Sequence, residues 1–288
     1  MREKVNYKDC SIEVNSLGAE LKSFCAAGKE YIWCSDPKYW KRSAPFLFPI
    51  VGSVKNKEIY IDGKRYEMGQ HGFLRDQEFK VVKKEEGYIA LETYSNDQTK
   101  IHYPYDFKAL VEYFLKDNEL ETKITITSYS DEMCFNFGGH PAFNCPMDNN
   151  KFEDYRIVFE KPETFNSPSV EEGGLLDFNK GVYQKENCKE IKLTKDIFTI
   201  DTILIRDIKS KKVMLLDNNN QGIEFSFPKF STLAIWTPYN DAPFICLEPW
   251  IGYNDLVDTN QDYKTKNDLI YLNKGESFFA SYKVKVIK

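Results

Sequence analysis

The sequence predicts a mainly-β protein, built as one large antiparallel β-sandwich with few short helices. Three observations support this prediction: apolar and polar residues alternate with a period of two, turn sequences separate the alternating runs, and helical periodicity is scarce. No Pro-, Gly- or Ser-rich linker divides the 288 residues, and no repeat of fixed period is visible. We therefore expect residues 1–288 to form a single domain.

Two segments show the alternation most clearly. In residues 223–227, Ile223 and Phe225 point one way and the polar side chains between them point the other. In residues 278–286, one face carries Tyr282 and its apolar neighbours, and the opposite face carries Phe279, Ser281, Lys283 and Lys285. This pattern is typical of antiparallel strands with one buried face.

Turn residues between such runs predict three hairpins, at residues 116–119, at Asp62-Gly63 and at residues 218–222. Short helices are expected at residues 36–42 and 152–155. No regular alternation of strands and helices occurs, which argues against a parallel α/β sheet.

Composition narrows the classes of partner. The net charge is -5 and no long basic run occurs, so nucleic acid and anionic membranes are poor candidates. No stretch of about 18 apolar residues could span a membrane, and the first residues lack the apolar segment of a signal peptide. We expect a cytoplasmic protein. Aromatic residues reach 15%, which suits strands and also provides flat apolar surfaces for sugar rings.

The cysteines and the familiar motifs predict neither a metal nor a cofactor. The seven cysteines include no C-x-x-C pair, so we interpret them as reduced thiols, mostly small apolar side chains near the core. No ligand spacing typical of zinc occurs. The sequence also lacks G-x-G-x-x-G, a P-loop, H-E-x-x-H and G-x-S-x-G.

The three histidines differ in their surroundings. His71 and His140 lie beside glycines, which let the backbone bend and a ligand approach closely. For either histidine taken alone, the favoured interpretation is a turn residue bonded to the backbone. His102 has no glycine beside it and is interpreted as structural.

The acidic candidate is Glu248. Four apolar residues lead directly into it, and Pro249 and Trp250 follow. A strand leaving the core would place this carboxylate in a partly desolvated position, where its pKa rises and suits a general base near neutral pH. The alternative is a glutamate at the rim, bonded to a backbone amide.

Together these segments resemble the aldose 1-epimerase (galactose mutarotase-like) family, especially its shorter bacterial branch. The resemblance runs in order along most of the chain and is carried by five segments, residues 17–21, 44–52, 70–76, 139–144 and 246–252. It implies a cofactor-independent isomerase of carbohydrate metabolism, with the supersandwich fold of galactose mutarotase and a free hexose in an open cleft.

The resemblance also implies roles for single residues. Glu248 matches the general base that takes the proton of the anomeric hydroxyl, and His140 matches the general acid that protonates the ring oxygen. His71 matches a second histidine that supports charge at the reacting oxygens. The implied substrate-binding residues are Arg75, Asp201, Asn144 and Trp250.

One position departs from the family pattern. Where relatives commonly have an arginine near the sugar, this chain has Ser53, and Lys55 or Lys57 would be the available substitutes. Lysine lacks the rigid fork that grips two oxygens. Two alternatives therefore stay open beside the mutarotase: a hexose-6-phosphate 1-epimerase, and a non-catalytic sugar-binding or regulatory protein. The oligomeric state is also open.

Overall fold

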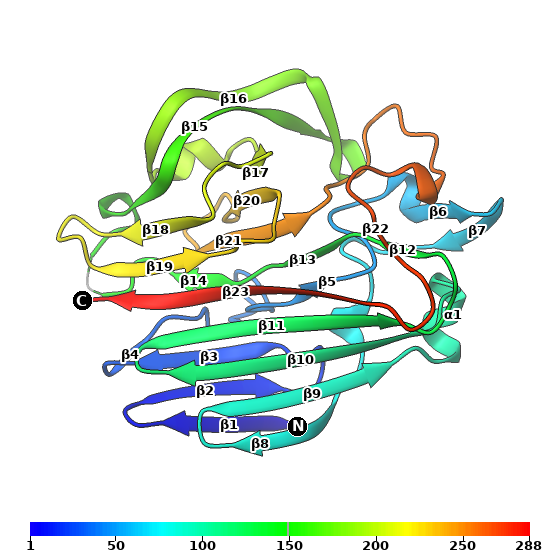
Figure 1. The fold of residues 1–288 in the computed structure, drawn as a ribbon. Coiled ribbons are helices and arrows are strands. Elements are labelled where there is room, and N and C mark those ends of the chain that lie inside the picture. The colour runs from blue at the N-terminus through cyan, green and yellow to red at the C-terminus, as the bar shows by residue number, and fades with distance from the viewer. Residues whose placement is uncertain (149) are drawn as a thin grey trace.

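A computed structural model describes residues 1–148 and 150–288 and has the mainly-β antiparallel fold expected from the sequence (Figure 1). Its largest sheet has nine strands in the order β16-β15-β18-β19-β23-β11-β10-β9-β8. The bounds of these strands are β8 Lys80–Glu85, β9 Tyr88–Tyr94, β10 Phe107–Lys116, β11 Glu119–Ser128, β15 Arg156–Glu171, β16 Leu175–Lys192, β18 Lys212–Leu216, β19 Gly222–Ser226 and β23 Ser277–Ile287.

Two further sheets pack against this one. A four-stranded sheet has the order β1-β2-β3-β4, and a six-stranded sheet has the order β17-β20-β21-β13-β5, with β14 also pairing with β21. The bounds are β1 Arg2–Tyr7, β2 Cys10–Asn15, β3 Leu21–Ala26, β4 Lys29–Glu30, β5 Phe46–Leu47, β13 Phe137–Gly139, β14 Ala142–Asn144, β17 Thr202–Arg206, β20 Thr232–Trp236 and β21 Phe244–Ile251.

The remaining elements are short. Two pairs of strands form separate ribbons, β6 Glu58–Ile61 with β7 Lys64–Glu67 and β12 Met133–Phe135 with β22 Ile270–Leu272. The α-helix α1 spans Asp97–His102, and the 3₁₀ turns are η1 Lys55–Lys57, η2 Leu74–Asp76, η3 Phe152–Asp154, η4 Glu172–Gly174, η5 Lys195–Phe198 and η6 Tyr263–Thr265. Within the described residues, no helix is both long enough and apolar enough to span a membrane.

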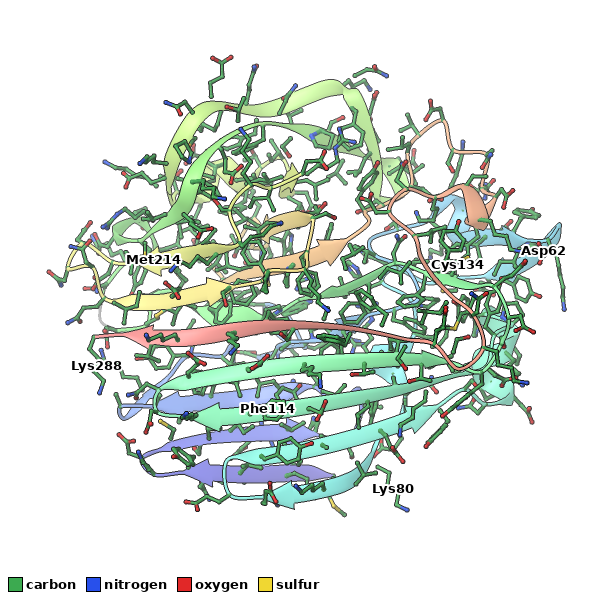
Figure 2. All side chains as sticks on the ribbon, viewed as in Figure 1. Asp62, Lys80, Phe114, Cys134, Met214 and Lys288 are labelled. Atoms are coloured by element: carbon green, nitrogen blue, oxygen red, sulfur yellow. The ribbon has the colours of Figure 1, made fainter. Side chains whose placement is uncertain are left out.

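Apolar side chains fill the space between the sheets (Figure 2). Tyr113 of β10 is fully buried and donates a hydrogen bond to the carbonyl of Ala19, beside the four-stranded sheet. Phe225 of β19 packs on Phe143 of β14 with ring centroids 5.6 Å apart. At these two positions, inward-facing side chains of the largest sheet contact residues in or beside another sheet, as in a sandwich.

The strand and hairpin predictions are confirmed. Residues 223–227 and 278–286 coincide with β19 and β23 to within a residue or two, and Ile223, Phe225 and Tyr282 are buried. The predicted turns connect β10 to β11, β6 to β7 and β18 to β19.

One helix prediction is wrong and another is confirmed. Residues 152–155 contain η3, but residues 36–42 form a turn without helix. The carboxylate of Asp36 accepts a hydrogen bond from the amide of Lys38, a local bond that competes with helix formation. The turn leaves the Trp40 ring stacked on the His140 ring, with centroids 4.7 Å apart. Helix α1, capped by Asn96, was not predicted.

Candidate active site

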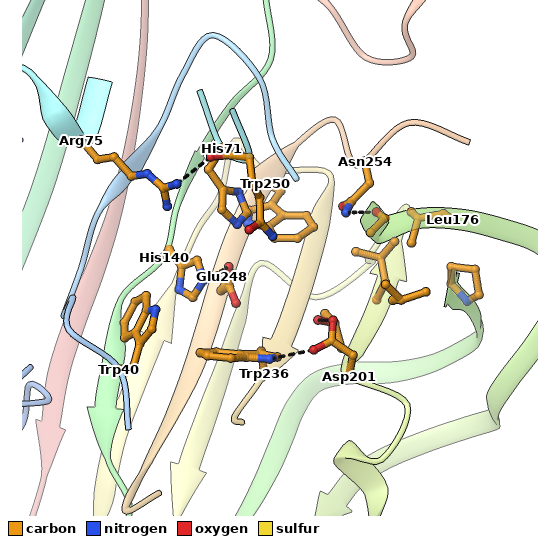
Figure 3. A pocket seen from close by; sticks show the side chains of 16 residues that line it. Trp40, His71, Arg75, His140, Leu176, Asp201, Trp236, Glu248, Trp250 and Asn254 are labelled. Atoms are coloured by element: carbon orange, nitrogen blue, oxygen red, sulfur yellow. Dashed lines mark hydrogen bonds and ion pairs between the residues drawn. The ribbon is translucent and has the colours of Figure 1, made fainter. Parts of the chain in front are cut away.

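A cavity of about 180 Å³ lies over the six-stranded sheet, where the long hairpin formed by β15 and β16 arches across it (Figures 1 and 3). Its lining comes from segments far apart in the sequence. The six-stranded sheet, with the residues just beyond its strand ends, contributes His140, Asp201, Trp236, Glu248 and Trp250. The loop between β7 and β8 contributes Gln70, His71 and Arg75, and the hairpin contributes Pro168, Val170, Gly174 and Leu176.

His140 and Glu248 are direct neighbours in this cavity. Nε2 of His140 lies 3.1 Å from Oε2 of Glu248, and both side chains are almost completely buried. Glu248 lies in the interior strand β21, opposite Ala234 of β20. His140 directly follows β13, the other neighbour of β21, and its amide donates to the carbonyl of Pro45. Sheet pairing therefore fixes the separation of an imidazole and a carboxyl group from distant parts of the chain.

Burial disfavours the charged form of both groups. Desolvation raises the pKa of Glu248 well above its ordinary value, and the nearby Asp201 carboxylate raises it further. Desolvation likewise lowers the pKa of His140 to about 3, with Arg75 contributing in the same direction. The pair therefore retains one transferable proton near neutral pH, either on the carboxyl group or, after internal transfer, on the imidazole.

The orientation of the His71 ring is fixed by a left-handed backbone conformation and by two hydrogen bonds with Gly52. Its φ is 63°, and its amide donates to the carbonyl of Gly52 across 2.8 Å. The amide of Gly52 in turn donates to Nδ1 of His71 at 3.0 Å. A side chain at Gly52 would collide with Asn254, and one at Gly72 would collide with the carbonyl of Phe48. The glycines near His71 therefore permit close backbone packing.

The His71 ring is neutral and holds its proton on Nε2. Nδ1 accepts the Gly52 hydrogen bond and so carries no proton. Burial, the His140 ring and Arg75 all lower the pKa of His71 well below its ordinary value. The ring centroids of His71 and His140 are 5.5 Å apart.

Arg75 lines the same end of the cavity. Its Nη2 donates to the carbonyl of Gln70, whereas Nε is buried without a hydrogen-bond partner among the described residues. Burial and the neighbouring Arg42 lower the pKa of Arg75 to about 10, so the guanidinium remains charged at neutral pH. Nε also lies 3.9 Å from Oδ2 of Asp76. Arg75 is therefore a cation that lines the cavity together with both histidines.

Asp201 and the tryptophans form the adjoining wall. Asp201 has a φ of 72°, and its Oδ1 accepts a hydrogen bond from Nε1 of Trp236 at 3.1 Å. Its side chain is exposed, which leaves acceptor capacity free. Trp40 and Trp236 both contact the His140 ring, and Trp250 faces His71 at 6.1 Å between centroids.

The structure brings six of the seven predicted site residues to this cavity. They are Glu248, His140, His71, Arg75, Asp201 and Trp250. Asn144 does not line it. The side-chain amide of Asn144 donates instead to the carbonyl of Glu30, which ties β14 to β4. Asn144 is therefore close to His140 in the sequence but lies outside the cavity.

The departure at Ser53 is accommodated by the hairpin. Ser53 is largely buried, and a Cβ added at Gly174 would lie 2.6 Å from its Oγ. Neither lysine takes the place of the missing arginine. Nζ of Lys55 donates to the carbonyl of Val257, and Lys57 does not line the cavity.

Sequence reasoning missed the far wall of the cavity. Pro168, Val170 and Leu176 come from the hairpin, and Asn254 holds it down by donating to the carbonyl of Gly174 at 2.7 Å. Trp40 and Trp236 were also missed. Both follow ordinary aromatic-rich stretches, and nothing in their local sequence distinguishes them from core residues.

Comparison with known proteins decides the family. The family model "Aldose 1-epimerase" matches residues 4–285. This chain belongs to the aldose 1-epimerase family. Protein LacX (plasmid) of Lactococcus lactis subsp. lactis is 32% identical in an alignment 288 positions long that covers 96% of each chain.

Solved structures of this family agree in fold. A galactose mutarotase related enzyme from Lactobacillus acidophilus superposes with a TM-score of 0.94 at 28% identity, over 100% of this chain and 98% of that one. A galactose mutarotase-like protein from Lactobacillus casei ATCC 334 gives a TM-score of 0.92 at 27% identity, over 100% of both chains. The predicted family and fold class are thereby confirmed.

Proposed function

We propose that this protein is an aldose 1-epimerase that interconverts the α and β anomers of a free aldose. The observation that carries the proposal is the contact between His140 and Glu248, 3.1 Å apart at the floor of a cavity that is also lined by His71, Arg75 and Asp201. Opening a cyclic hemiacetal needs one proton removed and one donated, and a paired carboxylate and imidazole can provide both.

In the proposed reaction, the Glu248 carboxylate removes the proton of the anomeric hydroxyl. Protonated His140 donates to the ring oxygen, and the C1–O5 bond breaks. The aldehyde rotates about C1–C2, and the ring recloses on its other face as both protons return. Rotation and reclosure invert C1 without any change in oxidation state.

The burial of the pair favours the ring-opened stage. Ring opening converts an ionised pair, Glu248 carboxylate with His140 imidazolium, into a neutral pair. Desolvation disfavours the charged form of each group. The protein therefore stabilises the protonation state that accompanies the aldehyde, which is the high-energy species of the reaction. No proton needs to leave for solvent during the cycle.

The remaining residues suit binding and charge support. His71 presents an Nε2–H donor, since its Nδ1 is engaged by Gly52, and this donor stabilises negative charge on a reacting oxygen. Asp201 and Arg75 offer an acceptor and a donor for sugar hydroxyls. The three tryptophans Trp40, Trp236 and Trp250 offer apolar faces against which a pyranose ring packs.

The far wall favours a free sugar over a sugar phosphate. Pro168, Val170, Leu176 and Leu204 are apolar, and among the described lining residues Arg75 is the one cation. A phosphate recognised there would lack the paired basic side chains that usually hold one. The hexose-6-phosphate 1-epimerase therefore ranks second.

Polarimetry on freshly dissolved sugars tests the proposal. α-D-Glucose, α-D-galactose and their 6-phosphates are each followed with and without enzyme. We expect faster approach to anomeric equilibrium for at least one free hexose, and a smaller acceleration for its phosphate. Calorimetric binding of a sugar without any acceleration would instead favour the non-catalytic sugar-binding protein.

A further inference from the structure

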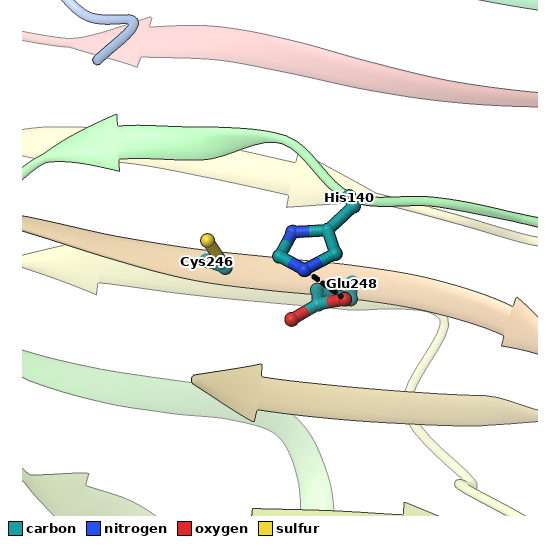
Figure 4. Close-up of side chains that lie close together, drawn as sticks. All are labelled: His140, Cys246 and Glu248. Atoms are coloured by element: carbon teal, nitrogen blue, oxygen red, sulfur yellow. Dashed lines mark ion pairs between the residues drawn. The ribbon is translucent and has the colours of Figure 1, made fainter. Parts of the chain in front are cut away.

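A cysteine lies against the acid–base pair. Cys246 is two residues before Glu248 in β21, so both side chains point to the same face of the strand. One donor atom each from His140, Cys246 and Glu248 lies within 4.8 Å of the others, and all three residues are buried (Figure 4). Cys246 itself is a free thiol, packed under Trp40 and Trp236.

We propose that His140, Cys246 and Glu248 form a zinc-binding site, and that Zn²⁺ bound there inhibits the enzyme. The zinc ion is an external inhibitor in this proposal, and the reaction proposed above does not use it. The binding step stands on the cluster alone, whereas the inhibition rests on the proposed epimerase function.

The donor set matches the preference of zinc. Zinc takes imidazole nitrogen, thiolate sulfur and carboxylate oxygen in tetrahedral sites, with bonds of about 2.0–2.3 Å. Two ligands at those lengths stand about 3.3–3.7 Å apart in a tetrahedron. The 3.1 Å between His140 Nε2 and Glu248 Oε2 is already close to that separation. The three donor atoms lie within 4.8 Å of one another. Bringing the Cys246 sulfur to about 3.7 Å from the other two donors therefore needs a shift of about 1 Å.

Buried donors of this cluster lack other partners. Among residues 1–148 and 150–288, none forms a hydrogen bond of regular geometry with Oε2 of Glu248, although Glu248 is only 1% exposed. Such an atom is costly to bury, and coordination of a cation relieves that cost. A thiolate ligand makes the site softer than an oxygen cluster, which favours zinc over magnesium or calcium.

The position of the cluster at the cavity determines how zinc reaches it and how bound zinc affects catalysis. His140 and Glu248 line the cavity, so an ion enters from there and keeps a fourth position open toward it. On binding, the thiol proton and the proton shared by the pair leave to solvent, and each ligand donates an electron pair to the metal. The imidazole can then no longer donate a proton, nor the carboxylate remove one. Zinc and sugar therefore exclude each other.

Direct metal binding tests the site without any assay of activity. We expect the purified protein to compete with a chromophoric chelator for Zn²⁺ at one equivalent. Co²⁺ used as a probe should produce a thiolate-to-cobalt charge-transfer band. Cys246→Ser should weaken zinc binding by at least about 100-fold, since even changes around metal ligands cost 10–100-fold, and it should remove the band. Cys134→Ser is the matched control, because Cys134 is also buried and reduced but lies outside the cluster.

Kinetics then separates the two proposals. If the wild type epimerises a sugar, Zn²⁺ should inhibit it competitively, and the ratio of rates with and without zinc should return toward one in Cys246→Ser. Zinc binding lost in Cys246→Ser with no epimerisation of any sugar would leave the metal site standing and refute the enzyme. Equal zinc affinity in Cys246→Ser and Cys134→Ser, or no binding at one equivalent, would overturn the metal site.

Discussion

The backbone amide of Gly52 donates to Nδ1 of His71 across 3.0 Å, which leaves Nε2 as the protonated ring nitrogen. Burial keeps this imidazole neutral at physiological pH by lowering its pKa. A neutral donor aimed into a cavity suits a reacting oxygen on which negative charge develops, because no proton has to be lost to form the hydrogen bond.

This arrangement predicts the tautomer of His71. The ¹⁵N shifts of the ring should show a protonated Nε2 and an unprotonated Nδ1 that do not titrate between pH 5 and 8, a range that spans the ordinary histidine pKa. A His71 ring that titrates near its ordinary pKa would contradict the buried, neutral donor.

Replacing His71 should reduce turnover more than binding. His71→Phe keeps an aromatic ring in place but removes the donor, and we expect kcat to fall by about 100-fold, the usual cost of losing one such donor. Steady-state polarimetry provides the measurement. His102→Phe serves as the control, since its ring lies outside the cavity and should leave the rate unchanged.

Replacing Glu248 tests its role as the general base. The rate should fall by at least about 100-fold in Glu248→Gln, because the base is lost. The control is Glu163→Gln, which changes another buried glutamate, one that accepts hydrogen bonds from the amides of Lys209 and Ser210. Glu163→Gln should retain activity in whatever fraction remains folded.

Relative to the wild type, the same variant should become more stable as the pH rises, because the wild type loses stability. The pKa of Glu248 is raised in the folded state, so the folded protein holds this proton more tightly than the unfolded chain. Wild-type stability is therefore lost relative to Glu248→Gln as the pH rises above 4.5, the ordinary glutamate value. The Asp201 carboxylate adds to the effect, because its negative charge raises the pKa of Glu248 further.

Urea unfolding at a series of pH values measures this difference. We expect Glu248→Gln to be more stable than the wild type by about 1–2 kcal/mol at pH 7, in line with the trade-off seen when active-site strain is removed. The two proteins should converge near pH 4. A pH-independent difference would show that Glu248 has an ordinary pKa.

Asp201 should contribute to sugar binding, so its replacement should change KM. Its Oδ1 is fixed by Trp236 and its carboxylate faces the cavity. Asp201→Asn tolerates the positive φ of 72° but removes the charge, and KM should rise about 10-fold or more, as for the loss of a charged hydrogen bond. Quenching of tryptophan fluorescence on sugar addition, from the three tryptophans that line the cavity, measures the affinity directly. A change in kcat alone would contradict this role.

Restoring the family arginine at Ser53 should harm the protein. Ser53 is largely buried, and Gly174 of the hairpin lies so close to it that a Cβ added at Gly174 would be 2.6 Å from Oγ of Ser53. Ser53→Arg should therefore displace the hairpin and cost about 1–3 kcal/mol, as overpacking does. Thermal unfolding tests this, with Ser277→Arg on the exposed start of β23 as control. A stable and more active Ser53→Arg enzyme would contradict the packing.

Much of this fold was predictable, because apolar and polar residues alternate along strands that have one buried face. Residues 278–286 are an example, and the turns at Asp62-Gly63 and residues 116–119 follow from local chemistry. At residues 36–42 the predicted helix is replaced by a turn with a local hydrogen bond from the amide of Lys38 to the carboxylate of Asp36. The long-range stacking of Trp40 on His140 that accompanies this turn has no local sequence signal.

The candidate site was predictable in part, for a different reason. His71, His140 and Glu248 lie in segments whose glycines and prolines stand out locally. The cavity wall at Val170 and Leu176 depends on how the long hairpin folds back, and the proximity of Cys246 to His140 depends on the pairing of β21 with its neighbours. Neither long-range relationship leaves a mark on local sequence, and Asn144 shows that nearness along the chain does not ensure a place at the cavity.

The most direct test of the acid–base pair is magnetisation transfer between the α and β anomeric protons of a sugar at equilibrium. With catalytic amounts of wild-type protein, irradiating one anomer of glucose or galactose should reduce the signal of the other, and Glu248→Gln should abolish the transfer. Absence of transfer for every free aldose that the folded wild-type protein binds, or transfer that persists undiminished in Glu248→Gln, would contradict catalysis by His140 and Glu248.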